Sequence, residues 1–213
     1  NTGQRLSTSN ASNHGDIGSN AVDLSYSSIS GIPFGATGNY STAMGGYTTA
    51  SGTSSTAMGE DSTASGWYST AMGNSTTASG SRSTAMGYGT TASGYYSTAM
   101  GYQTYAIGNY STAMGDNTTA SGEYSTAMGR RTTASDYAST VIGQYNSSGS
   151  SVTNNATSFN TANTAFVIGN GTNSSNKSDA FKVMFNGDTT VSNDLTVSGD
   201  VVISSDARLK SNI

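Results

Sequence analysis

The sequence predicts an all-β protein built mainly of a parallel β-solenoid with coils of fourteen residues. Alanine falls on every seventh position from Ala36 to Ala134, fifteen times in succession. The residues after each alanine alternate between Met-Gly and, with a few exceptions, Ser-Gly. The segments after this array alternate apolar and polar residues and carry turn signals, which indicates short strands. Internal repetition at a short fixed period is typical of solenoids, so we expect a rod rather than a catalytic cleft.

Each fourteen-residue coil has two similar halves, S-T-A-M-G-x-x and T-T-A-S-G-x-x. We expect each half to form about five residues of strand and a two-residue turn, with Gly45 and its equivalents at the bends. Alternation along a strand places Ser41 and Ala43 on one face and Thr42 and Met44 on the other. Alanine therefore fills a cramped interior, methionine lines one outer face and serine lines the opposite one. Seven to eight coils stacked about 4.8 Å apart give a rod roughly 35 Å long.

Composition shifts divide the chain into five segments. The first segment is polar and irregular. It contains the single histidine, His14, which we expect to be solvated, and one strand is expected near residues 21–26. In the fourth, Asn170-Gly171 and Asn186-Gly187 are hairpin-turn signals. The segments are an irregular N-terminal segment (1–35), the repeats (36–145), a neck or loop (146–164), a strand-rich stalk (165–204) and a terminal motif (205–213).

Charge and composition exclude several classes of function. Only 9% of the residues are charged and the net charge is −4, so nucleic-acid binding is not expected. No apolar run approaches the roughly 20 residues of a membrane span, so this segment should not insert into a membrane. The chain has no cysteine, which is compatible with an extracellular protein. It begins at Asn1 without methionine or a signal peptide, so we expect a processed chain or a fragment.

The apolar outer face predicts self-association. Burial of one methionine side chain stabilises an assembly by about 1.5–3 kcal/mol, and monomers rarely expose a long apolar stripe. The alternative is that the methionines line the interior of a monomeric rod. The predicted stripe on the axis of an oligomer consists of Met44, Met58, Met72, Met86, Met100, Met114, Met128 and Ile142.

Aromatic residues recur in the turns and are candidates for receptor contact. Aromatic rings with polar tips suit carbohydrate and protein surfaces, although stacking between coils or chains is an equally physical role. The candidate receptor-facing residues are Trp67, Tyr68, Tyr88, Tyr95, Tyr96, Tyr102, Tyr110 and Tyr124.

Other patterns carry weaker functional hypotheses. The threonine ladder of the serine face, from Thr49 to Thr133, resembles the hydroxyl arrays of ice-binding solenoids but is broken at Tyr105 and Ile107. Glu60 and Asp61 form a carboxylate pair with no partner base or nucleophile, so no catalytic residue is predicted. No cofactor is predicted, although the Asn- and Asp-rich turns offer oxygen ligands for Ca²⁺.

The repeat text Ser41-Thr42-Ala43-Met44-Gly45 and Thr48-Thr49-Ala50-Ser51-Gly52 resembles the head repeats of trimeric autotransporter adhesins. That resemblance covers about 110 residues. It implies a left-handed parallel β-roll and a homotrimer whose hydrophobic faces meet on the axis, followed here by a neck and a trimeric stalk.

The last nine residues, from Ser205 to Ile213, resemble the start of the endosialidase-type intramolecular chaperone domain of phage tail fibres and spikes. The resemblance implies autocleavage between Ser205 and Asp206 by groups in the body of the chaperone, and we expect that body to be missing from this chain. The region from Phe166 to Thr190 also resembles the segment upstream of such chaperones.

Together these observations predict a non-enzymatic, extracellular fibre that attaches a virion or a cell surface to a host. Its expected partners are two further copies of itself and a host-surface glycan or protein receptor. A bacterial surface adhesin or extracellular filament subunit is the alternative within the same class. An ice-binding solenoid or a polysaccharide-degrading tailspike are the alternatives from other classes.

Overall fold

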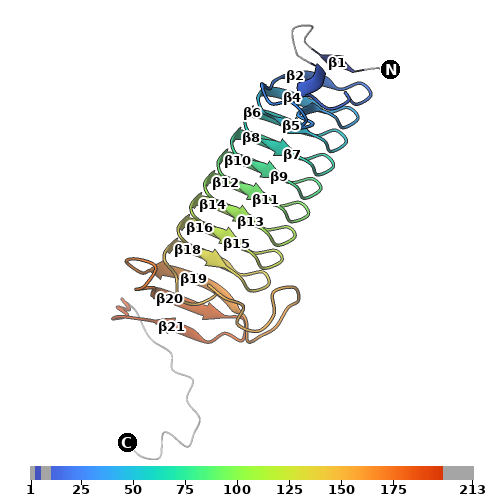
Figure 1. The fold of residues 1–213 in the computed structure, drawn as a ribbon. Helices are drawn as coiled ribbons and strands as arrows, with labels where there is room; N and C mark the ends of the chain where they lie inside the picture. Colours follow the sequence, from blue (N-terminus) through green and yellow to red (C-terminus); the bar gives the residue numbers. More distant parts are fainter. Residues whose placement is uncertain (1–2, 6–10, 199–213) are drawn as a thin grey trace, which may run out of the picture.

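A computed structural model describes residues 3–5 and 11–198 and shows a straight rod of stacked coils (Figure 1). It is an all-β parallel solenoid of about ten turns, each of about fourteen residues. Two sheets run along the rod, one of thirteen strands and one of eight. Strand β1 lies at one end, and the β19–β21 strands lie at the other (Figure 1).

The thirteen-stranded sheet contains the Met-Gly half of every coil. Its strands follow one another in chain order, so each coil adds one strand beside the previous one. They are β1 (Gln4–Arg5), β2 (Val22–Tyr26), β4 (Thr42–Gly46), β6 (Thr56–Glu60), β8 (Thr70–Asn74), β10 (Thr84–Tyr88), β12 (Thr98–Tyr102), β14 (Thr112–Asp116), β16 (Thr126–Arg130), β18 (Thr140–Gln144), β19 (Thr164–Asn170), β20 (Asp179–Met184) and β21 (Thr189–Val191).

The eight-stranded sheet contains the other half of each coil, and its strands have only two residues. They are β3 (Gly35–Ala36), β5 (Thr49–Ala50), β7 (Thr63–Ala64), β9 (Thr77–Ala78), β11 (Thr91–Ala92), β13 (Tyr105–Ala106), β15 (Thr119–Ala120) and β17 (Thr133–Ala134). The expected five residues of strand in this half are therefore too many. The reason is that Ser51 N–H and Gly52 N–H both bond to the Ala64 carbonyl, and Ser55 N–H then bonds back to the Gly52 carbonyl, which closes a turn.

Register is the same from coil to coil, so identical side chains stack in columns. In β10 and β12, Ala85 pairs with Ala99 and Met86 pairs with Met100. The alanines of both halves are fully buried and form one continuous core with Val141 and Val167. Interior serines flank this core, and Ser41 Oγ donates to the Gly38 carbonyl at 2.7 Å. The predicted placement of alanine inside and methionine outside is confirmed.

The turns contain residues with positive φ, and at most of these positions the residue type does not predict that conformation. Gly45 has φ of 109°, as its predicted place at a bend demands. The second residue of nearly every turn also has positive φ, between 44° and 60°, although tyrosine, serine, arginine, aspartate and asparagine occupy it. Backbone bonds to the neighbouring coil hold this conformation, such as Tyr68 N–H to the Thr53 carbonyl at 2.9 Å.

The described part of residues 1–35 is more regular than predicted. Strands β1 and β2 extend the large sheet, and a short 3-10 helix, η1 (Ala11–Asn13), lies between them in the sequence. The expected strand near residues 21–26 is β2. Asp23 occupies the slot that alanine fills in the next coil, Ala43, and is fully buried.

Two polar side chains close the small sheet where it ends at β17. The Asn146 side chain accepts a bond from Thr133 N–H at 2.8 Å and donates to the Thr133 carbonyl at 2.9 Å. The side-chain amide of Asn146 thereby makes the two hydrogen bonds with Thr133 that the backbone of one further strand would make. Asp136 is also buried, and its carboxylate accepts bonds from Thr153 N–H at 2.6 Å and Thr164 N–H at 2.8 Å. These bonds hold the 146–163 loop against the end of the solenoid.

After that loop the chain adds one more parallel strand and then reverses. Strand β19 pairs in parallel with β18, with Val167 opposite Val141, and β20 and β21 continue the sheet in antiparallel fashion. The predicted hairpin at Asn186-Gly187 is confirmed by the turn between β20 and β21. The predicted tight turn at Asn170-Gly171 is wrong, because residues 171–178 form a longer connection. β21 ends at Val191, and residues 192–198 of the predicted strand-rich stalk form no strand. The rest of that predicted stalk, residues 199–204, lies outside the described residues.

Strands β20 and β21 fall within the predicted stalk and β19 begins one residue before it, but the division of the chain into five segments stays a prediction.

Candidate functional site

An apolar column runs along the outer surface of the thirteen-stranded sheet. Met44 is 36% exposed, and the other array methionines and Ile142 are partly exposed as well, each stacked on its equivalent in the next coil. Leu24 extends the column at one end and Ile168 at the other, because they pair with Met44 and Ile142. None of these side chains belongs to the alanine core. The column is thus a flat apolar face on an already packed rod.

The turns between the small and the large sheet form a second surface, the aromatic edge. It comprises Trp67, Tyr68, Arg82, Tyr95, Tyr96, Tyr110, Tyr124 and Tyr137. Its members come from equivalent turns of successive coils, so the constant register stacks them along the rod.

Ring stacking makes most of this edge continuous. Tyr110 and Tyr124 are parallel with centroids 4.8 Å apart, and Tyr96 and Tyr110 are parallel at 5.4 Å. Tyr95 contacts Tyr96 edge to face at 4.3 Å. The pKa of Tyr96 is raised above the ordinary tyrosine value, first by hydrogen bonding with Tyr95 and then by desolvation. Desolvation, followed by the neighbouring Tyr110, raises the pKa of Tyr124. These phenols therefore stay neutral to higher pH than a free tyrosine.

Arg82 is the only charged member of the aromatic edge. Its guanidinium carbon lies 5.2–5.7 Å from the ring centroids of Tyr68, Tyr95 and Tyr96, within cation–π range. It also donates to the Tyr95 hydroxyl at 2.8 Å. Trp67 stands beside this cluster, is 64% exposed, and makes no ring contact or side-chain hydrogen bond with any described residue. Its indole face is therefore available to a ligand.

The other turn edge carries the remaining two predicted receptor residues. Tyr88 and Tyr102 stack in parallel with centroids 5.2 Å apart, and both are about half exposed. Glu60 and Asp61 lie on this edge, where Asn74 Nδ2 donates to Glu60 Oε2 at 2.9 Å. The structure thus distributes the predicted receptor residues over two edges, and it brings six of the eight together on the aromatic edge.

The threonine ladder lies on the small sheet, partly exposed, with exposed serines beside it. Tyr105 and Ile107 are 40% and 50% exposed and interrupt its flat surface in the middle of the rod. Ice binding by this ladder stays a prediction.

The prediction that His14 is solvated is wrong. Its side chain is buried, with Nδ1 3.5 Å from Asp23 Oδ2 and 3.4 Å from Ser25 Oγ. Asp23 also accepts bonds from Arg5 Nε at 2.8 Å and from Ser25 Oγ at 2.6 Å. A catalytic triad would place the serine and the carboxylate on different nitrogens of the imidazole, whereas both approach Nδ1 here. The cluster closes the N-terminal end of the core. The sequence feature that indicates this cluster is Asp23, which stands at the position that alanine occupies in the next coil.

Residues 3–5 and 11–198 contain neither a metal-binding cluster nor a membrane-spanning helix. This part of the chain contains no group of three or more His, Cys, Asp and Glu side chains arranged to hold a metal ion. Some of its turn carboxylates bond to the protein itself, as Asp188 does with Asn186 Nδ2 at 2.7 Å. No helix in the described residues is long and apolar enough to span a membrane.

Stacked identical coils with an outward apolar face define a fibrous β-solenoid, which is a class of structural protein. Residues 36–146, just over half of the chain, match the YadA head domain repeat in seven overlapping two-copy windows: 36–62, 50–76, 64–90, 78–104, 92–118, 106–132 and 120–146. The chain therefore belongs to the YadA head repeat family, and its repeats are those of an adhesin-type surface fibre of extracellular or cell-surface location. No curated protein sequence matches the chain.

Proposed function

We propose that three copies of this chain assemble side by side into a fibre head that attaches its carrier to a host surface. The observation that carries the proposal is the apolar column, which is exposed on a rod whose own core is already complete. YadA-type adhesin heads are homotrimers that bind host surfaces. The membership of this chain in the YadA head repeat family supports the same assembly here. Each methionine buried at the trimer axis contributes about 1.5–3 kcal/mol before the entropic cost of association.

Chain count in solution tests the assembly. The unmodified chain should give the mass of a trimer by size-exclusion chromatography with light scattering. The double variant Met86→Lys/Met100→Lys should be monomeric, because six ammonium groups would be brought together on one apolar axis. The matched control, Ser79→Lys/Ser93→Lys, introduces the same charges on the opposite, exposed face and should remain trimeric. A monomeric unmodified chain, or a trimeric methionine variant, would contradict the proposal.

The aromatic edge is the surface that we propose for receptor contact, with a glycan or protein of the host surface as partner. Trp67 is its free ring, and exposed tryptophan commonly supplies a large share of binding energy. Replacing Trp67 with alanine should weaken binding of labelled trimers to arrays of immobilised glycans and cell-surface proteins about tenfold or more. Trp67→Phe should recover part of it.

The control for this experiment is Thr53→Ala, which alters the equivalent position one coil earlier and should leave binding unchanged. If Trp67→Ala and Thr53→Ala bind equally well to every immobilised partner of the unmodified chain, the aromatic edge is not the contact surface.

The carrier of the fibre is a separate part of the proposal. The resemblance of residues 205–213 to a chaperone start supports a phage tail fibre that is trimmed between Ser205 and Asp206. These residues lie outside the described residues, so the support comes from the motif alone. Mass spectrometry of the protein purified from its native source should find a chain that ends at Ser205. A native chain that continues beyond Asp206 would favour the cell-surface adhesin instead.

A further inference from the structure

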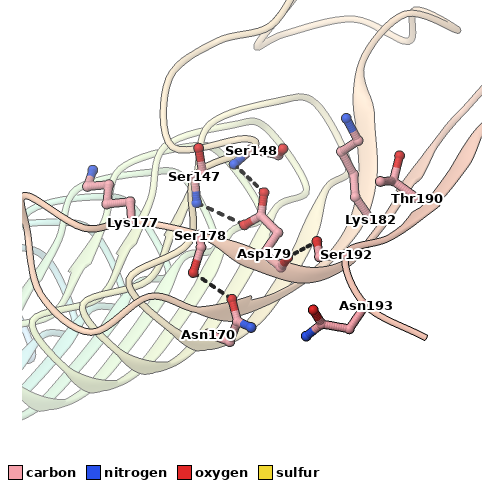
Figure 2. A pocket seen from close by; sticks show the side chains of 10 residues that line it. All are labelled: Ser147, Ser148, Asn170, Lys177, Ser178, Asp179, Lys182, Thr190, Ser192 and Asn193. Carbon is pink, nitrogen blue, oxygen red and sulfur yellow. Dashed lines mark hydrogen bonds between the residues drawn. The ribbon is translucent and has the colours of Figure 1, made fainter. Parts of the chain in front are cut away.

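A polar hollow lies at the C-terminal end of the rod, outside the aromatic edge. One of its lining residues, Lys177, also borders Asn117, Arg131 and Tyr145 of the other turn edge. The hollow has a volume of about 370 Å³ and lies between the chain that leaves the solenoid and the β19–β21 strands (Figure 2). Lys177, Lys182, Ser147, Ser148, Thr190 and Asn193 are among its lining residues. Ligand pockets of this kind usually measure about 300–1,000 Å³, so one or two sugar-sized groups fit.

The walls of the hollow are fixed by hydrogen bonds. The Asp179 carboxylate accepts bonds from Ser147 N–H and Ser148 N–H, both at 2.8 Å, and so ties the loop to β20 (Figure 2). Ser178 Oγ donates to Asn170 Oδ1 at 2.7 Å, and Ser192 Oγ donates to the Asp179 carbonyl. The loop and the strands that carry the lining residues are therefore held together before any ligand arrives, which lowers the entropic cost of binding.

Several polar side chains in the hollow have no hydrogen-bond or ion-pair partner among the described residues. Within residues 3–5 and 11–198, neither Lys177 nor Lys182 forms an ion pair, although Lys182 is partly buried. The side-chain hydroxyls of Ser147, Ser148 and Thr190 likewise make no hydrogen bond there. The chain has only three lysines and a net charge of −4, yet two of the lysines line this one hollow.

The chemistry of these groups is that of an anionic, hydroxyl-rich ligand. Lys177 and Lys182 lie on either side of Asp179 (Figure 2), and the oxygens of that carboxylate already accept two backbone hydrogen bonds. The excess positive charge suits a carboxylate or sulfate, and the free hydroxyl and amide groups suit sugar hydroxyls. We infer that this hollow binds an acidic saccharide, with Lys177 and Lys182 on its anionic group.

Isothermal titration calorimetry on the full chain tests this inference with three probes: methyl glucuronoside, the neutral methyl glucoside and inorganic sulfate. Methyl glucuronoside should bind at millimolar concentration, and more tightly than either of the others. Lys177→Gln and Lys182→Gln should each weaken its binding about tenfold or more, because each removes a charge-assisted hydrogen bond. The control Arg130→Gln removes the same charge elsewhere and should bind as the unmodified chain does.

Each contrary result overturns the inference. Equal affinity for the neutral glucoside would show that the anionic group makes no contact in the hollow. Equal affinity for sulfate would show that the sugar makes none. Undiminished binding by both lysine variants, with circular dichroism showing a normal fold, places the ligand elsewhere. The result does not depend on the proposed attachment surface, since Trp67→Ala should leave glucuronoside binding unchanged.

Discussion

Replacing Gly87 with alanine is expected to lower the free energy of unfolding by more than about 4 kcal/mol and to prevent stable folding of the rod. Gly87 has φ of 121°, a conformation that residues with a side chain rarely adopt. A Cβ atom at this position would lie 2.0 Å from the Gly101 carbonyl oxygen of the next coil. Relief of this clash would require the two coils to separate, which breaks the hydrogen bonds between them. Chemical denaturation followed by circular dichroism measures the loss.

Gly89→Ala is the matched control, because it lies in the same coil and also has positive φ, at 60°. Its Cβ would meet only the Cγ atom of Gln103, at 3.4 Å. Other coils place serine or arginine at the same turn position, so the loss should be about 1 kcal/mol or less. Equal destabilisation by the two substitutions would show that positive φ alone, rather than the approach of the next coil, demands glycine.

Replacing Asp136 with alanine should destabilise the C-terminal end of the rod by about 3–6 kcal/mol, since two hydrogen bonds to a charged group are lost at about 1.5–3 kcal/mol each. The Thr153 and Thr164 amides would lose their carboxylate partner, and Thr164 is itself buried. We expect the 146–163 loop to open first. Hydrogen exchange should therefore become faster at Thr153 and Thr164 than in the middle of the array.

Glu123→Ala provides the comparison for Asp136→Ala, because it removes the same charge from a turn residue whose side chain makes no hydrogen bond with any described residue. Its effect should stay within about 0.5 kcal/mol. If Asp136→Ala were equally mild, the loop would be held by other contacts than the carboxylate.

The repeated half of the fold was predictable from the sequence because each coil repeats the same packing problem. Because the fifteen alanines share one spacing, they can all line the same interior. The alternation of strand faces then places methionine outside. The two ends were predicted less well, because there the chain departs from its own pattern. The Val-Ile-Gly text of residues 141–143 recurs at residues 167–169 and marks the return of the chain to the sheet as β19. The two copies are offset by 26 residues rather than by fourteen, which hides the recurrence from a search at a fixed period.

The candidate sites show the same contrast. The stacking of Tyr96, Tyr110 and Tyr124 follows from their spacing of fourteen residues, so the sequence was sufficient to group them. The hollow around Lys177 and Lys182 was not predictable, because it is assembled from a loop and a hairpin whose approach depends on Asp179. The burial of His14 was missed for a similar reason. Its neighbour Asp23 also pairs with Arg5, which lies in a separate strand that local composition does not indicate.

The identical edge that every coil presents to its neighbour has a consequence for how such rods diversify. Insertion or deletion of one fourteen-residue unit would change the reach of the fibre by about 4.8 Å while leaving both end closures and the orientation of every surface unchanged. Recombination between neighbouring repeats in the gene can therefore adjust the distance between the carrier and its target in uniform steps. A family of such proteins is expected to vary in length far more readily than in cross-section.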